Sequence, residues 1–222
     1  MKGAAGAVAA GVLAGVALQL AARWRGHRRL EAALKLGSSA GLLVFVALVD
    51  CGQSYGRWIE AGLVASFVGD AFLIGRSRQW LGLGLAAFLA AHLATFGAAL
   101  DRIAIERVSP PAFTLLVAAV VFVGAATFLR VRPRLGTLLL PAAIYTLALC
   151  SMAGAAATAF LSEWWAAGHW LLGLGGALFL ASDVAVALQR FEGDSLRLRL
   201  WGLPAYYAGQ LCLAASTAWP GQ

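Results

Sequence analysis

The chain has 222 residues, of which 61% are hydrophobic and only 12% are charged, and its formal net charge is +7. A soluble domain usually has about 25% charged residues, so this composition excludes an ordinary soluble protein. The arginines lie in short clusters between apolar runs instead of along one basic face, which favours membrane topology over nucleic-acid binding. Three distant cysteines, Cys51, Cys150 and Cys212, give neither a disulfide framework nor a metal-ligand spacing.

Eight hydrophobic segments follow one another, each long enough to cross about 30 Å of hydrocarbon as an α-helix. Lipid offers no hydrogen-bonding partners to backbone N–H and C=O groups, and in an α-helix these groups bond to one another. We therefore expect an all-α polytopic membrane protein, a bundle of about eight transmembrane helices, with residues 1–222 forming a single transmembrane domain. The expected helices are 3–22, 32–50, 58–75, 80–100, 111–130, 136–157, 165–188 and 200–219.

Positive charges are distributed unevenly between the two sides of this expected bundle. The side of the termini holds Lys2, Arg57, Arg102 and Arg107. The odd-numbered connections hold twelve arginines, which are Arg23, Arg25, Arg28, Arg29, Arg76, Arg78, Arg130, Arg132, Arg134, Arg190, Arg197 and Arg199. The positive-inside rule then predicts a multi-pass protein of the bacterial inner membrane, with both termini outside and the odd-numbered connections in the cytoplasm.

Two acidic residues, Asp70 and Asp183, fall within the hydrophobic segments. An ionisable side chain at membrane depth costs at least about 2.5–3.5 kcal/mol, so it needs a partner or a function. Each lies about five residues before its helix end, which is roughly 8 Å from the cytoplasmic edge of the membrane at ~1.5 Å per residue. The surrounding segments, ASFVGDAFL and LFLASDVAVAL, occupy third place in two four-helix halves and indicate a weak parallel internal repeat.

Further polar side chains gather at a similar depth on other expected helices. They are Lys35, His92, Tyr145, Tyr206, Tyr207 and Gln210. Each has a simpler explanation, because a lysine can extend its ammonium to the surface, tyrosines can anchor a helix at the interface, and a histidine can make one interhelical hydrogen bond. Their convergence predicts instead one shared, wet cavity that opens toward the cytoplasmic leaflet.

Several of these residues belong to motifs that occur in a fixed order along the chain. The motifs are Ser66-Phe67-Val68-Gly69-Asp70, then Phe88-Leu89-Ala90-Ala91-His92, then Pro141 with Tyr145 and Met152, then Gly176-Ala177-Leu178-Phe179 before Ser182-Asp183, and finally Tyr206-Tyr207-Ala208-Gly209-Gln210. In order and spacing they resemble the motifs of the YhhN family of membrane proteins, which includes the lysoplasmalogenases. One departure is Leu36, which follows Lys35 where the family commonly has proline.

The resemblance implies an eight-helix enzyme that acts on a lysophospholipid in the membrane. Such an enzyme hydrolyses the vinyl ether bond of a lysoplasmalogen to a fatty aldehyde and a glycerophospho-base. The reaction needs a proton on the alkenyl carbon, a stabilised oxocarbenium ion and attack by water, so we interpret Asp70 and Asp183 as an acid and an ionised partner, in either order. His92 is expected to orient the water or to relay protons. The expected substrate contacts are Lys35 and Arg76 at the phosphate, Tyr206, Tyr207 and Gln210 at the glycerol, and Tyr145.

Two alternatives stay open at this point. In a metal-dependent lipid hydrolase, Asp70, Asp183 and His92 would be the ligands of zinc or a similar ion, although no HExxH or clustered-histidine spacing supports this. In a proton-coupled transporter or a lipid-binding membrane protein, the carboxylates would carry protons or bind a cation. We expect neither a cofactor nor a nucleic-acid partner, and the sequence does not define an oligomeric state.

Overall fold

A computed structural model of the chain describes every residue except 1, 50–53, 76, 194 and 220–222. Within these residues the fold is a bundle of eight α-helices with three short 3₁₀ helices and no strand, which confirms the expected all-α class. The α-helices are α1 (Lys2–Trp24), α2 (Arg28–Leu48), α3 (Ser54–Ile74), α4 (Arg78–Leu100), α5 (Pro110–Val131), α6 (Leu139–Ser162), α7 (Ala167–Phe191) and α8 (Leu196–Ser216).

Each observed helix overlaps one expected segment, but several helices extend further than hydrophobicity alone indicates. Helix α2 begins at Arg28 instead of 32, α8 begins at Leu196 instead of 200, and α6 ends at Ser162 instead of 157. The added turns of α2 and α8 are rich in charged residues, and backbone hydrogen bonding continues through them because a helix does not end where its side chains stop being apolar. These extra turns carry arginines into the cavity described below.

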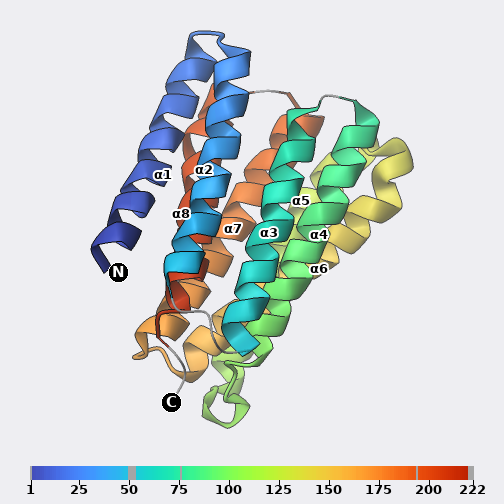
Figure 1. The fold of residues 1–222 in the computed structure, drawn as a ribbon. Helices are drawn as coiled ribbons and strands as arrows, with labels where there is room; N and C mark the ends of the chain where they lie inside the picture. The colour runs from blue at the N-terminus through green and yellow to red at the C-terminus, as the bar shows by residue number, and fades with distance from the viewer. Residues whose placement is uncertain (1, 50–53, 76, 194, 220–222) are drawn as a thin grey trace.

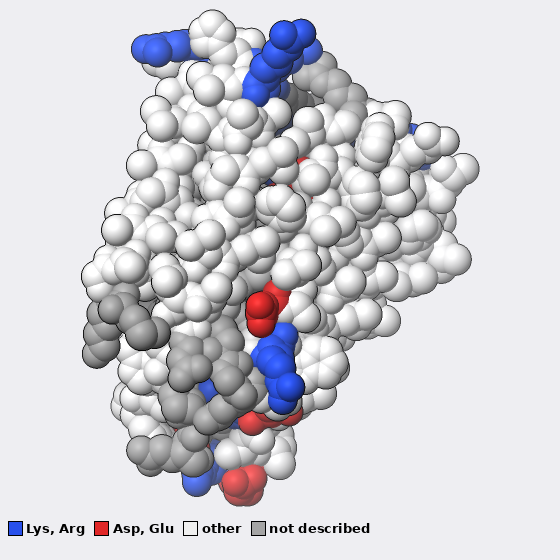
Figure 2. All heavy atoms as spheres, viewed as in Figure 1, with Lys and Arg blue, Asp and Glu red and all other residues white. Residues whose placement is uncertain are grey.

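Six of the eight helices are long and apolar enough to cross a membrane, namely α1, α2, α4, α5, α6 and α7. Helix α3 contains three charged residues, Arg57, Glu60 and Asp70, and α8 begins with two arginines and carries a glutamine. On the face drawn in Figure 2, most Lys and Arg atoms lie toward the two ends of the molecule, and the surface between them is largely uncharged. The chain is therefore a multi-pass membrane protein.

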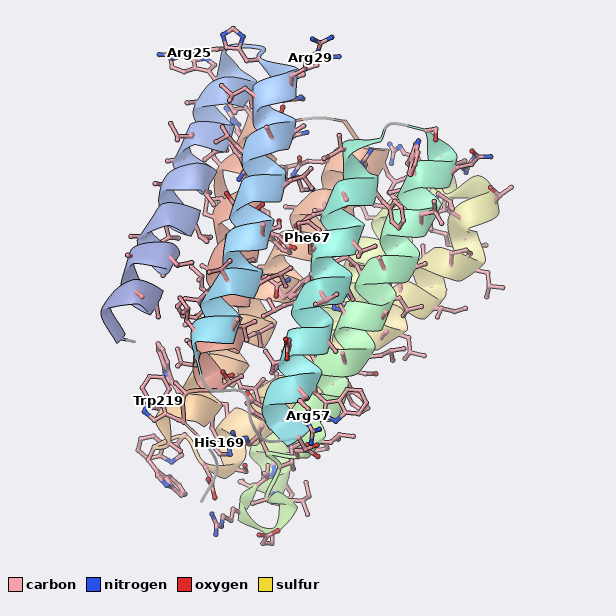
Figure 3. The ribbon with its side chains drawn as sticks, viewed as in Figure 1. Arg25, Arg29, Arg57, Phe67, His169 and Trp219 are labelled. Atoms are coloured by element: carbon pink, nitrogen blue, oxygen red, sulfur yellow. The ribbon has the colours of Figure 1, made fainter. Side chains whose placement is uncertain are left out.

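The helices run alternately up and down the bundle (Figure 1). The α1–α2, α3–α4, α5–α6 and α7–α8 connections share one end, where Arg25 and Arg29 are labelled in Figure 3. Arg57, His169 and Trp219 mark the opposite end (Figure 3). Helices α7 and α8 pack along each other, as do α3 with α4 and α1 with α2. The arginine-rich connections therefore come together at a single end of the bundle.

Polar contacts connect the helices at both ends. At the arginine-rich end, Arg130 on α5 donates to both carboxylate oxygens of Glu192, over 2.6 and 2.8 Å. These hydrogen bonds from Arg130 lower the pKa of Glu192, which lies just beyond α7. At the other end, the Arg102 guanidinium lies 4.0 Å from the centre of the Tyr55 ring, and His169 contacts the Arg102 carbonyl oxygen at 3.1 Å. Both sets of contacts lie outside the cavity.

Helices α7 and α8 approach each other closely where glycines face one another. A Cβ atom built on Gly209 would lie 3.0 Å from the carbonyl oxygen of Gly175 and 3.2 Å from the backbone nitrogen of Phe179. Those neighbours are backbone atoms, so they cannot rotate away as a side chain can. Small residues at this crossing therefore set the spacing of the two helices, which in turn places Asp183 and Tyr206.

We predict that Gly209→Ala lowers the free energy of unfolding by about 1–3 kcal/mol, the usual cost of overpacking a well-packed contact. Gly154→Ala is the matched control, because a Cβ at Gly154 would meet nothing within 4 Å. Unfolding of both variants in the same detergent measures the difference. Equal stability of the two variants would contradict the close α7–α8 crossing.

Candidate active site

A large cavity connects the polar interior to the arginine-rich end of the bundle. Its volume is about 890 Å³, within the usual range for small-molecule sites. Among the described residues, every helix except α5 contributes to its lining. The inner part is lined by Lys35, Asp70, Phe88, Tyr145, Ser182, Asp183 and Tyr206, and the outer part by Arg23, Arg28, Arg29, Glu31, Arg190 and Arg199.

Asp70 on α3 is almost completely buried and receives polar contacts from two other helices. Its Oδ2 accepts hydrogen bonds from the Ser39 hydroxyl at 2.6 Å and from the Tyr206 hydroxyl at 2.7 Å. Its Oδ1 lies 3.0 Å from the Nζ of Lys35, whose side chain is 22% exposed toward the cavity. Two hydroxyl donors and an ammonium group stabilise a carboxylate as an anion, so Asp70 belongs to a fully paired charge network.

Asp183 on α7 has a different set of partners, contributed by α4 and α6. The Tyr145 hydroxyl donates to its Oδ2 at 2.6 Å, and the Nε2 of His92 lies 3.0 Å from the same oxygen. Nε2 is also 3.0 Å from the Tyr145 hydroxyl, so the three polar groups are in mutual contact. Both contacts reach Oδ2, and the carboxyl group also borders the cavity with 9% of its side chain exposed.

A row of packed aromatic rings links the partners of the two carboxyl groups. The Tyr206 ring centre is 5.6 Å from that of Phe179 and 6.0 Å from that of Phe88, in edge-to-face arrangements. Phe179 in turn lies 4.9 Å from the His92 ring. The rings thus run continuously from the partner of Asp70 to the partner of Asp183, and their packing fixes both tyrosine hydroxyls.

Three of the expected site residues, Tyr207, His92 and Gln210, are not among the residues that line the cavity. Tyr207 donates to the Lys35 carbonyl oxygen at 3.1 Å and lies 3.2 Å from the Ser39 hydroxyl. His92 and Gln210 are fully buried, and the Nδ1 of His92 and the Nε2 of Gln210 have no hydrogen-bond partner among the described residues. These three side chains therefore support groups on the cavity surface.

The other expected substrate contacts do not all lie free at the cavity surface. Tyr145 and Tyr206 line the cavity, as a substrate contact must. Lys35 also lines it, but its ammonium is engaged by Asp70. Arg76, the expected phosphate contact, lies outside the described residues.

Sequence reasoning missed Ser39 and the outer arginines as members of the site. Ser39 follows Lys35 by four residues, so the two lie on one helical face one turn apart, and this spacing was the available signal. Of the arginines, only Arg76 was named as a substrate contact, and the others were interpreted as determinants of topology. The positions of Arg28, Arg29 and Arg199 in the cavity wall depend on how far α2 and α8 extend beyond their apolar segments.

The arrangement does not match the ligand set of the metal alternative. Among the described residues, no three His, Cys, Asp or Glu side chains lie close enough together to hold one ion. Asp183 and His92 are in contact, but Asp70 is held by Lys35, Ser39 and Tyr206 instead. Asp70, Asp183 and His92 therefore do not form a common ligand shell in this structure.

The fold and the cavity define a class of protein, a polytopic membrane protein with two carboxyl groups inside the bundle at the end of an arginine-lined entrance. Comparison with known proteins adds the family. The model of the YhhN family matches residues 30–217, and the chain belongs to this family.

Two groups of curated relatives are similar to most of the chain. A protein of Mycobacterium bovis named lysoplasmalogenase is 32% identical over 197 residues, covering 86% of this chain and 71% of the relative, and one of Mycobacterium tuberculosis with the same name gives the same values. The Sus scrofa protein named lysoplasmalogenase TMEM86B is 28% identical over 177 residues, covering 80% of this chain and 70% of the relative. No solved structure matches the chain.

We predict a strong energetic coupling between Lys35 and Asp70. Lys35→Met leaves a buried carboxylate without its ammonium partner, which typically costs about 3–5 kcal/mol. In Lys35→Met/Asp70→Asn both charges are absent, so its loss of stability should be smaller than the sum of the two single losses. Unfolding of the wild type and the three variants gives this double-mutant cycle. Additive losses would mean that the ion pair does not form in the membrane protein.

Proposed function

We propose that this chain is a membrane-embedded lysoplasmalogenase-type hydrolase, which cleaves the vinyl ether bond of a lysoplasmalogen to a fatty aldehyde and a glycerophospho-base. The observation that carries the proposal is that Asp70 and Asp183 line the same cavity. Relatives named lysoplasmalogenase give it independent support. The substrate is a lysophospholipid that enters the cavity from the lipid or from the arginine-rich end.

In the proposed first step, Asp183 donates a proton to the alkenyl carbon of the substrate. Its Oδ2 is already engaged by Tyr145 and His92, so we assign the transferable proton to Oδ1, which neither of these residues contacts. His92 acts as a positioning residue, because it is fully buried and touches Asp183 instead of the cavity. Proton transfer breaks the Oδ1–H bond, forms a C–H bond and leaves an oxocarbenium ion on the neighbouring carbon.

In the second step, the ionised Asp70 stabilises this cation, and the carboxylate of Asp183 takes a proton from the attacking water. The product is a hemiacetal, and Asp183 has recovered its proton. Collapse of the hemiacetal returns the bonding electrons to the glycerol oxygen, which takes up the proton of the hemiacetal hydroxyl, and releases the aldehyde. One water molecule is consumed for each vinyl ether bond, and no oxidant or reductant is required.

The two carboxyl groups take different roles because their partners differ. Asp70 has an ammonium and two hydroxyl donors, whereas Asp183 has a phenol and an imidazole, so we assign the charged role to Asp70 and the proton transfer to Asp183. We assign Tyr206 and Tyr145 to contacts with the glycerol oxygens. Tyr207 and Gln210 hold Lys35 and the α8 face in place behind them.

We also propose that the cavity opens to the cytoplasmic side of a bacterial inner membrane, with both termini outside. The support is the positive-inside rule together with the gathering of four arginine-bearing connections at the end where the cavity opens. In this orientation the carboxylates lie about two helical turns below the headgroups, at ~5.4 Å per turn. That is the depth at which a lysolipid presents the first atoms of its chain.

The activity proposal predicts that Asp183→Asn and Asp70→Asn each reduce aldehyde release from a lysoplasmalogen by at least about 100-fold, the usual contribution of a positioned acid or base. Asp101→Asn is the matched control, because Asp101 is an exposed residue at the end of α4. Mass spectrometry of the purified protein with the lysolipid measures the product. Full activity in both cavity variants would rule out the paired-carboxylate mechanism.

The topology proposal predicts opposite labelling of the two ends. In a background with Cys51→Ser, Cys150→Ala and Cys212→Ala, a membrane-impermeant maleimide added to intact cells should label Arg57→Cys and leave Arg25→Cys unlabelled. Both should react after the cells are opened. The reverse pattern would place the cavity entrance outside.

A further inference from the structure

The outer part of the cavity is strongly basic. We call it the arginine rim, and its described charged members are Arg23, Arg28, Arg29, Glu31, Arg190 and Arg199. Five arginines accompany one glutamate, so the described part of the rim carries an excess of positive charge. Guanidinium groups bind phosphate in a planar, two-bonded geometry, so the charge and the donor type both point to a phosphate ester.

Glu31 organises part of this rim. Its Oε1 lies 3.0 Å from Nη1 of Arg199 on α8, and its Oε2 lies 3.5 Å from Nη1 of Arg23 on α1. One carboxylate therefore holds guanidinium groups from two other helices at the cavity edge. The side chains involved remain 20–29% exposed, so the paired guanidinium groups still border the cavity. The rim is thus built by α1, α2 and α8 together.

Three rim arginines are each separated from a residue of the inner site by the same number of residues. Arg28 precedes Lys35 by seven residues on α2, Arg190 follows Asp183 by seven on α7, and Arg199 precedes Tyr206 by seven on α8. Seven residues are close to two helical turns, so each pair lies on one helical face, separated by about 10 Å along the axis at ~1.5 Å per residue. Three helices therefore place a cation at the same distance from the inner site.

This distance matches the substrate of the proposed reaction. Seven bonds separate the protonated alkenyl carbon of a lysoplasmalogen from its phosphorus atom. An extended chain advances about 3.5 Å for every three bonds, so the two atoms are about 8 Å apart. This distance along the lipid and the distance of about 10 Å along the helix axis differ by less than the length of one arginine side chain. A lysolipid with its vinyl ether at Asp183 would therefore have its phosphate at the rim.

We propose that the arginine rim is a phosphodiester subsite that holds the headgroup phosphate of the lysolipid two helical turns above the carboxylates. The inference rests on the proposed function, and it assigns the phosphate to Arg28, Arg190 and Arg199. Lys35 lies two turns further inside and is engaged by Asp70. The subsite makes the enzyme selective for phosphate-bearing lipids, because a neutral alkenylglycerol offers no phosphate oxygens to accept hydrogen bonds from these guanidinium groups.

The test compares two double variants that remove the same number of charges from the same end of the protein. R28Q/R190Q removes rim arginines, and R25Q/R197Q removes exposed arginines that are not among the cavity-lining residues. Each is assayed with an alkenyl lysophospholipid and with the corresponding alkenylglycerol. We expect the ratio of kcat/KM for the phosphate-bearing over the phosphate-free substrate to fall at least tenfold in R28Q/R190Q and less than twofold in R25Q/R197Q.

A binding measurement separates this inference from the proposed function. The 1-alkyl analogue of the lysolipid has no vinyl ether double bond, so its affinity does not depend on the reaction. It should bind R28Q/R190Q at least tenfold more weakly than R25Q/R197Q, even if no aldehyde is released from any substrate. Equal losses in the two double variants would overturn the subsite. Inorganic phosphate that binds the wild type as tightly as the alkyl analogue would also overturn it, because the rim would then hold a free anion.

Discussion

The need to satisfy two carboxyl groups inside an apolar bundle constrains the rest of this structure. An unpaired carboxylate at this depth would be very costly, so each aspartate must receive donors from other helices. Asp70 on α3 is reached from α2 and α8, and Asp183 on α7 is reached from α4 and α6. These four helix pairs are therefore held together by polar contacts as well as by packing. The close approach of α7 and α8 at their glycines contributes to the same arrangement of donors, since it brings Tyr206 close to the centre of the bundle.

Much of the fold could be predicted from the sequence because the lipid environment restricts which backbone structures can form. A long apolar segment must be helical, and the helices that it forms could be counted and roughly bounded from composition. The two aspartates stood out for the same reason, since a charged residue in such a segment is rare. The helix ends were harder to predict. The first turns of α2 and α8 are rich in arginine, so hydrophobicity alone does not show that these turns are part of the helices.

The pairing inside the site could not be read from the sequence. Lys35 and Asp70 are partners, as are His92 and Asp183, but this depends on the rotation and tilt of each helix, which follow from side-chain packing across the whole bundle. The same information decides which residues face the cavity. Tyr206 faces it, while its neighbour Tyr207 points to the backbone of α2. Depth along a helix was predictable from residue number, but direction around the helix was not.

The position of Tyr206 has a consequence for biosynthesis. Tyr206 and Asp70 are 136 residues apart, and Tyr207 is 172 residues from Lys35, yet they belong to the same network. A ribosome releases α3 into the membrane long before it has made α8, so Asp70 initially has donors from α2 alone. The last helix therefore completes the polar centre, and a nascent chain interrupted before α8 leaves that centre open to quality-control proteases.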